Sequence, residues 1–248
     1  LANALHDPGD AKPLTASGLM RGDVPLIGRV EAGSTAWVRF TGLSENVTAA
    51  LTAYHDVVKT GEPLEIEIDR KRWQVIGAAW DGGPLPGLFS YQALIDRNTT
   101  AALDDSLTLR FLTGTTFHSM GLNVPLPRPD LIFGSLQNRW RTFTPLVLRE
   151  LPDDLFGAFL NYHIEIDRCV IETSPYKAKH GETFVGFNGE VSFHLLRFSP
   201  YLMKKDARIE QGIRDHAEWF MRVIQLLGEF AVFSGVGYKT TIGFGMVG

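Results

Sequence analysis

Alternating and helical patterns of hydrophobic residues follow one another along the first 105 residues. Ser34–Leu43 alternates with a period of two and is rich in aromatic and β-branched residues, which predicts a strand. Ser44 is a typical N-cap, and the apolar spacing after it predicts a helix over Glu45–Val58. Two more strands and a short helix are expected at Leu64–Ile68, Trp73–Ala79 and Phe89–Asp96.

The same patterns return at greater length after residue 105. They predict a strand, a helix, further strands, a long amphipathic helix and a last strand that contains glycine. The ranges are Ser106–Leu112, Asp130–Phe143, Phe159–Glu172, Thr183–Phe187, Val191–Leu196, Arg208–Phe230 and Tyr238–Val247. Asn188-Gly189 is the strongest short hairpin signal in the chain. We interpret this half as β-α-β-β-α-β.

That order is the split βαβ of the ferredoxin-like fold. We therefore predict an α+β protein with two tandem ferredoxin-like (RRM-like) domains, residues 1–105 and 106–248. The first domain is expected to lack its N-terminal strand and most of its first helix, because Leu1–His6 is typical of the last turn of a helix. We accordingly expect further sequence upstream of Leu1. The fold type hosts many activities and does not decide the function.

Composition restricts the class of protein more than its function. With 248 residues, 44% of them hydrophobic, the chain has the proportions of a soluble globular protein of one large or two small domains. The longest apolar stretch, Val223–Phe233, is interrupted by polar residues, so we expect no membrane span. Cys169 is the only cysteine, which excludes an intramolecular disulfide and favours a reducing, cytoplasmic location.

Charge neither requires nor excludes a nucleic-acid partner. The net charge is −4. Residues 1–108 hold 9 Lys and Arg against 14 Asp and Glu, whereas residues 109–248 hold 15 against 14. Because RNA affinity depends on a local basic groove, an acidic total does not exclude it.

The run from Gly235 to Gly245 (GVGYKTTIGFG) carries the strongest chemical signal. Two Gly-x-Gly triplets, Gly235 with Gly237 and Gly243 with Gly245, flank Lys239. Glycines let backbone N–H groups approach an anion, and lysine supplies positive charge to phosphates. The alternative is a helix C-cap followed by a glycine-bulged edge strand. On the anion-binding interpretation, Gly243→Val is expected to lower RNA affinity with little effect on stability.

This run resembles the glycine-rich C-terminal loop of the CRISPR-associated endoribonucleases of the sixth Cas family, RAMP-type proteins that cut CRISPR repeat transcripts into guide RNAs. Other segments similar to that family are Leu5-His6-Asp7, Lys12-Pro13-Leu14-Thr15-Ala16-Ser17, Phe117-His118-Ser119, Pro125-Leu126-Pro127, Phe133-Gly134-Ser135-Leu136 with Arg139-Trp140, and Phe184-Val185-Gly186. Together they extend from His6 to Gly245. The chain departs from the family in two respects: the family's first strand is absent, and Leu14 replaces an aromatic residue.

The resemblance implies a metal-independent endoribonuclease that needs no cofactor. In the family the ribose 2′-hydroxyl attacks the adjacent phosphate, which gives a 2′,3′-cyclic phosphate and a 5′-hydroxyl. His6 and Lys12 match the family's catalytic histidine and its frequent lysine. A histidine has a pKa suited to proton transfer. The alternatives are a histidine that interacts with a helix end and a solvated loop lysine.

Basic residues of the second domain are further RNA-binding candidates. Arg139 and Arg141 flank Trp140 on a predicted helix, which suits phosphate contact and base stacking. The alternative places Trp140 in the core and the arginines in solvent. His163, Glu165 and Asp167 alternate along one predicted strand, but the polar face of a half-buried strand explains them as well, so no metal site is assigned.

Three functions remain in competition at this stage. The first is an endoribonuclease for CRISPR repeat RNA, with the glycine-rich loop and the cleft between the domains as the RNA site. The second is a non-catalytic RAMP subunit that holds guide RNA in an effector complex. The third, a ferredoxin-like regulator of small ligands, is disfavoured by the paired glycine triplets. The resemblance leaves open partnership with other CRISPR effector subunits and homodimerisation.

Overall fold

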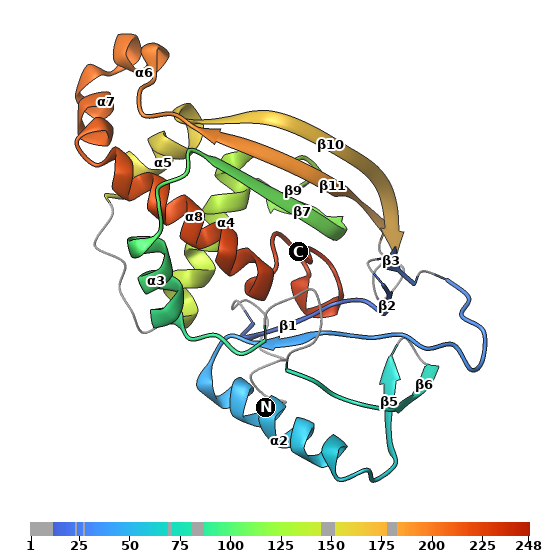
Figure 1. Ribbon diagram of the computed structural model, residues 1–248. Helices are drawn as coiled ribbons and strands as arrows, with labels where there is room; N and C mark the ends of the chain where they lie inside the picture. Colours follow the sequence, from blue (N-terminus) through green and yellow to red (C-terminus); the bar gives the residue numbers. More distant parts are fainter. Residues whose placement is uncertain are drawn as a thin grey trace.

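The computed structural model describes residues 12–22, 24–26, 28–68, 71–80, 87–144, 152–177 and 183–248. The predicted α+β fold of two tandem ferredoxin-like domains is confirmed. In Figure 1 the elements of residues 40–75 lie in the lower part of the view, whereas the last helix of the first half lies beside the helices of the second half.

A three-stranded antiparallel sheet forms the frame of the second half. Its strands are β7 (Ser106–Thr115), β10 (Ile164–Lys177) and β11 (Thr183–Leu195), in the order β10-β11-β7. The C-terminal residues extend this sheet beyond β7, because Leu112 N donates to Met246 O at 2.8 Å and Gly248 N donates to Arg110 O at 3.0 Å. The last residues thus occupy the position of the fourth strand of a ferredoxin-like sheet.

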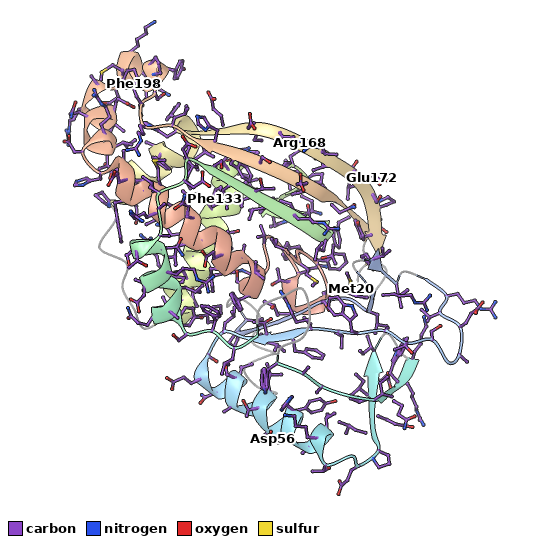
Figure 2. All side chains as sticks on the ribbon, in the orientation of Figure 1. Met20, Asp56, Phe133, Arg168, Glu172 and Phe198 are labelled. Carbon is purple, nitrogen blue, oxygen red and sulfur yellow. The ribbon has the colours of Figure 1, made fainter. Side chains whose placement is uncertain are left out.

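Helices cover one face of this sheet (Figure 1). The helices of the second half are α4 (Pro129–Phe143), α5 (Asp153–Tyr162), α6 (Pro200–Lys205), α7 (Ala207–Arg214) and α8 (Ala217–Ser234). Aromatic side chains dominate the core between them and the sheet, among them Phe111, Phe133, Trp140, Phe159, Phe187, Phe193, Phe220 and Phe230. In Figure 2 Phe133 lies between sheet and helices, whereas Arg168 and Glu172 lie on β10, away from the helices.

The first half is built from two helices and short strands. It contains β1 (Leu14–Ala16), β2 (Met20–Arg21), β3 (Val24–Pro25), β4 (Phe40–Gly42), α2 (Glu45–Lys59), β5 (Leu64–Ile68), β6 (Lys71–Val75) and α3 (Tyr91–Thr100). β1 pairs with β4 and β5 pairs with β6, both antiparallel. Short elements of the second half are β8 (Phe117–Ser119), β9 (Leu122–Val124) and the 3-10 helix η2 (Thr240–Ile242).

α3 packs against α8, although it precedes residue 105. Arg222 of α8 donates to the carbonyl oxygens of Asn98 (2.6 Å) and Ala101 (3.1 Å) at the end of α3. Arg97 also pairs with Glu229 at 3.2 Å. The two halves therefore share an extensive contact, and a domain boundary near residue 105 stays a prediction.

The hairpin predicted at Asn188-Gly189 is wrong. Both residues lie inside the continuous strand β11, where the register against β7 shifts between Phe187 and Gly189. Gly189 has φ +130°, and a Cβ there would collide with the carbonyl oxygen of Val170 on β10. The glycine therefore marks a bulge in the middle strand and not a turn.

Several other boundaries differ from the predicted ones. In the first half, the strand expected over Ser34–Leu43 is limited to β4, the strand expected over Trp73–Ala79 is β6, and the helix expected over Phe89–Asp96 is α3. The strand signal within Phe159–Glu172 corresponds to β10, which begins at Ile164 and continues to Lys177, whereas Phe159–Tyr162 belong to α5. The helix expected over Arg208–Phe230 is divided into α7 and α8, with the break at Asp215-His216. The segment expected as a strand over Tyr238–Val247 contains η2, and only its last residues extend the sheet, through the bridge of Val247 to Phe111 and the bond of Met246 O with Leu112 N.

β10 forms an outer edge of the sheet. The strand has 14 residues, and its register against β11 shifts between Ile166 and Arg168. Most of its side chains are exposed from Glu165 onwards. Within the described part of the chain, no helix is long and apolar enough to cross a membrane.

Candidate functional site

Two segments that lie far apart in the sequence meet beside the end of α8. Ser17, directly after β1, forms a parallel bridge with Gly243 of the glycine-rich run. Thr15 of β1 donates its hydroxyl to Phe233 O at 2.9 Å, a contact between residues 218 positions apart. The Lys12–Ser17 segment and the glycine-rich run therefore lie side by side (Figure 1).

The glycines of this run lie close to other parts of the backbone. Gly235 is the C-cap of α8, as the alternative interpretation proposed. Gly243 has φ +101°, and a Cβ on it would lie 2.8 Å from Gly18 N. Gly245 has φ +68°, and its Cβ would collide with the carbonyl oxygen of Val236. A side chain at Gly243 is thus strained whatever the loop binds, and the expectation that Gly243→Val spares stability is wrong.

Lys239 lies at the centre of the run in a left-handed conformation, with φ +61°. Its ammonium is 5.2 Å from the ring centroid of Tyr238 and 5.6 Å from that of Phe184. Phe184 in turn packs edge-on against Phe244, with 4.7 Å between centroids. Lys239 therefore carries its charge beside aromatic rings, a combination that suits phosphate and base contacts of RNA.

The partly exposed Tyr238 is a candidate for RNA contact that the sequence pattern did not single out. Its ring is 5.8 Å from the ring of His118 on β8, and 44% of the residue is exposed. The signal was present, because Tyr238 directly precedes Lys239. The proximity of His118 depends on a contact across more than a hundred residues, which no local pattern reveals.

The two arginines predicted to bind RNA have different surroundings. Arg139 is largely buried and donates to the carbonyl oxygens of Ser234 and Gly237, the latter at 3.1 Å. Burial lowers the pKa of Arg139 to about 10. Arg141 is exposed and pairs with Asp153 at 2.7 Å. Arg139 thus supports the glycine-rich run from within, and only Arg141 presents its guanidinium to solvent.

Trp140 belongs to the core, as the alternative interpretation proposed. The residue is 1% exposed and makes edge-on contacts with Tyr91 and Phe230, each with 5.2 Å between centroids. Stacking of an RNA base on Trp140 is therefore excluded.

A second arginine, missed by the sequence analysis, also reaches α8. Arg39 precedes β4, and its guanidinium donates to Val232 O. Its backbone N–H donates to Ser17 Oγ at 2.8 Å, so it also contacts the segment after β1. Burial lowers the pKa of Arg39 to about 10. No local pattern marks Arg39, because it alternates with apolar neighbours like any polar strand residue.

Of the predicted catalytic pair, the structure describes one member. Lys12 is half-buried at the start of the segment that leads into β1. The next residue, Pro13, accepts a hydrogen bond from Leu43 N at 2.8 Å. His6 lies outside the described residues, so its pairing with Lys12 stays a prediction.

His163 has a structural role. It is fully buried, its Nε2 lies 2.8 Å from Glu210 Oε2, and its Nδ1 lies 3.0 Å from Leu196 O. Glu210 also accepts from Ser199 N at 3.0 Å, so the pair is satisfied on both sides. Glu165 and Asp167 are exposed on β10. Among the described residues no three His, Cys, Asp or Glu side chains gather as metal ligands would.

Comparisons with known proteins identify the family and agree with the fold. The model of the family described as CRISPR-associated endoribonuclease Cas6 matches residues 109–247, more than half of the chain. Among curated proteins, no sequence matches.

Three solved structures share the fold. A Thermus Cas6 (TTHA0078) in a product complex is 26% identical, with a TM-score of 0.71, and the match covers 99% of this chain and 85% of the relative. Its substrate mimic complex is 25% identical, with a TM-score of 0.68, and the match covers 95% of this chain and 84% of the relative. A Cas6 of Thermus thermophilus (TTHB231) in a product complex is 25% identical, with a TM-score of 0.71, and the match covers 99% of this chain and 84% of the relative.

The family match extends from β7 to the end of the glycine-rich run, and the similarity to solved structures extends over nearly the whole chain. Within that fold, the Lys12–Ser17 segment contacts the glycine-rich run. The chain belongs to the Cas6 family of CRISPR-associated endoribonucleases.

Proposed function

We propose that this protein binds CRISPR repeat RNA and cuts it by attack of a ribose 2′-hydroxyl on the adjacent phosphate. The P–O bond to the 5′-oxygen of the next nucleotide breaks as the new P–O bond forms. The products are a 2′,3′-cyclic phosphate and a 5′-hydroxyl. A base takes the proton of the 2′-hydroxyl, and an acid gives a proton to the leaving 5′-oxygen.

The contact between the Lys12–Ser17 segment and the glycine-rich run carries this proposal. It brings the segment that begins at Lys12, whose charge suits a phosphorane-like transition state, to the run that contains Lys239, which lies beside aromatic rings. His6 is six residues before Lys12 and supplies the general acid or base. The Thermus relatives, solved as product and substrate mimic complexes, support a substrate site in this fold.

Cleavage of a labelled repeat RNA in EDTA, followed by analysis of the product ends, tests the reaction. His6→Ala is expected to lower the single-turnover rate by roughly 10²–10⁴-fold, the range that acid–base groups contribute. Binding should change little, because phosphate contacts dominate affinity. His216→Ala is the matched control, since His216 is exposed at the break between α7 and α8.

Lys12→Ala tests whether Lys12 stabilises the charge of the transition state. It should slow cleavage at saturating RNA by losing charge stabilisation in the transition state, whereas Lys59→Ala at the end of α2 should not. A wild-type rate for His6→Ala would assign the acid or base to another residue. Tight binding of repeat RNA without any cutting by the wild type would favour the non-catalytic RAMP subunit.

A further inference from the structure

The last turn of α8 is bonded by side chains from three separate elements. Helix ends leave their final carbonyl groups without intrahelical partners. Here Val232 O accepts from Arg39, Phe233 O accepts from Thr15 Oγ1 at 2.9 Å, and Ser234 O accepts from Arg139. Three successive carbonyls are therefore satisfied from the segment before β4, from β1 and from α4.

These contacts are partly buried, and two of them involve a charged side chain. Thr15 is 5% exposed, and burial lowers the pKa of both Arg39 and Arg139 to about 10, so both stay protonated at neutral pH. Positive charge is favourable at the C-terminal end of a helix, where the backbone dipole is negative. Partial burial also strengthens each bond and makes its loss more costly.

The same side chains connect this helix end to the glycine-rich run and to β1. Arg139 bonds both Ser234 O and Gly237 O, and so joins the last turn of α8 to the run that follows. Arg39 N donates to Ser17 Oγ, and Ser17 bridges to Gly243. β1 therefore contacts the end of α8 through Thr15, and the segment directly after β1 contacts the glycine-rich run through Ser17.

We propose that Arg39, Thr15 and Arg139 are positioning residues for cleavage, which hold the glycine-rich run at a fixed distance from the Lys12–Ser17 segment. The inference rests on the proposed function. None of the three needs to touch RNA. Their effect passes through the run and β1, whose relative position decides whether charge from both sides reaches one phosphate.

The number of bonds made by each arginine gives a sharp test. Arg139 bonds two carbonyls, which a lysine cannot span in the same way, whereas Arg39 makes one side-chain bond that a lysine can replace. At saturating repeat RNA, Arg139→Lys should therefore lower the single-turnover rate by on the order of tenfold to a hundredfold. Arg39→Met should do the same, and Arg39→Lys should recover most of the rate.

Arg222 provides the matched control. It too bonds two carbonyls at a helix end, those of Asn98 and Ala101, but it lies on the α3 side of α8. Arg222→Lys should lower the melting temperature to a similar degree without changing the rate at saturating RNA. Thr15→Val, which keeps the side-chain shape, serves if an arginine variant fails to fold.

Hydrogen–deuterium exchange of residues 235–245 gives a readout besides activity. The amides of Val236 and Tyr238 are bonded to Gly245 O and Thr116 O, both at 2.8 Å. They should exchange faster in Arg139→Lys and in Thr15→Val, and at the wild-type rate in Arg222→Lys. Unchanged exchange in all variants would overturn the inference.

Cleavage and exchange together separate the two proposals. Faster exchange with an unchanged rate at saturating RNA would leave these residues a structural role only and would overturn positioning. If the wild type cuts no repeat RNA, the proposed function fails. The exchange experiment then still decides whether the three side chains hold the run.

Discussion

Arg139 and Arg141 are two positions apart on α4 and consequently lie on different sides of the helix. The first is enclosed and bonds two backbone carbonyls, whereas the second forms an exposed ion pair. The sequence pattern around Trp140 treats them alike, because it contains no information on which side α8 packs. Local patterns therefore select candidate residues, but they do not distinguish a side chain that can contact a ligand from one that bonds the protein's own backbone.

Trp140→Ala should reduce the free energy of unfolding by about 3–5 kcal/mol, because it removes a large buried ring and leaves a cavity. Arg141→Ala removes one exposed ion pair and should change it by less than about 1 kcal/mol. Urea unfolding monitored by circular dichroism measures both. Equal effects would contradict the difference in burial.

Tyr91 makes stability depend on alkaline pH. Burial raises its pKa to about 12 from an ordinary value of 10, and its hydroxyl donates to Leu43 O at 2.7 Å. The folded state keeps the proton that the unfolded state loses, so this contribution is complete below pH 10 and is lost as pH rises towards 12. Relative to Tyr91→Phe, the wild type should lose about 1–2 kcal/mol, reduced for partial exposure, between pH 9 and 12.

Individual elements were predictable where local pattern and tertiary context agree. α2, α4 and the β5–β6 hairpin lie within one or two residues of the predicted ranges at most of their ends. The hairpin turn predicted at Asn188-Gly189 is wrong because the same residue pattern also fits a bulge. Only the pairing with the neighbouring strands β7 and β10 decides between the two. The expected last strand is interrupted before its final residues, because the contacts of Gly243 and Gly245 involve distant backbone.

Glycine substitutions separate elements that need glycine from those that tolerate a side chain. Gly243→Ala should destabilise the protein by about 1–3 kcal/mol, because φ is +101° and the Cβ would approach Gly18 N. Gly134→Ala in α4 meets no atom within 4 Å and should be neutral or stabilising by up to about 1 kcal/mol. Thermal unfolding of the two variants tests this contrast.

At the scale of the whole molecule, the two halves are joined at both ends of α8. Arg222 near its start bonds α3, and Arg39 and Thr15 at its end connect it to the segments around β1. The sequence predicted the two-domain order and the motif segments of the site. It could not predict these connections, because each joins residues separated by more than a hundred positions.

The net charge of −4 requires RNA binding to depend on a local basic site. The affinity for repeat RNA should therefore fall by about tenfold to a hundredfold between 50 and 200 mM salt, as expected for a few phosphate contacts. The single-turnover rate at saturating RNA should change much less. Filter binding and cleavage assays over this salt range provide the comparison, and an affinity independent of salt would contradict phosphate-based binding.

The long outer strand β10 has a consequence for the behaviour of the protein at high concentration. Among the described residues no further strand pairs with β10, and an unpaired strand edge of 14 residues is a template for pairing with another chain. Here the register shift at Asp167, the charges of Glu165, Arg168 and Glu172, and Pro175 interrupt that edge. Replacing Glu165, Arg168 and Glu172 by neutral residues is therefore expected to increase aggregation, which light scattering at high protein concentration measures.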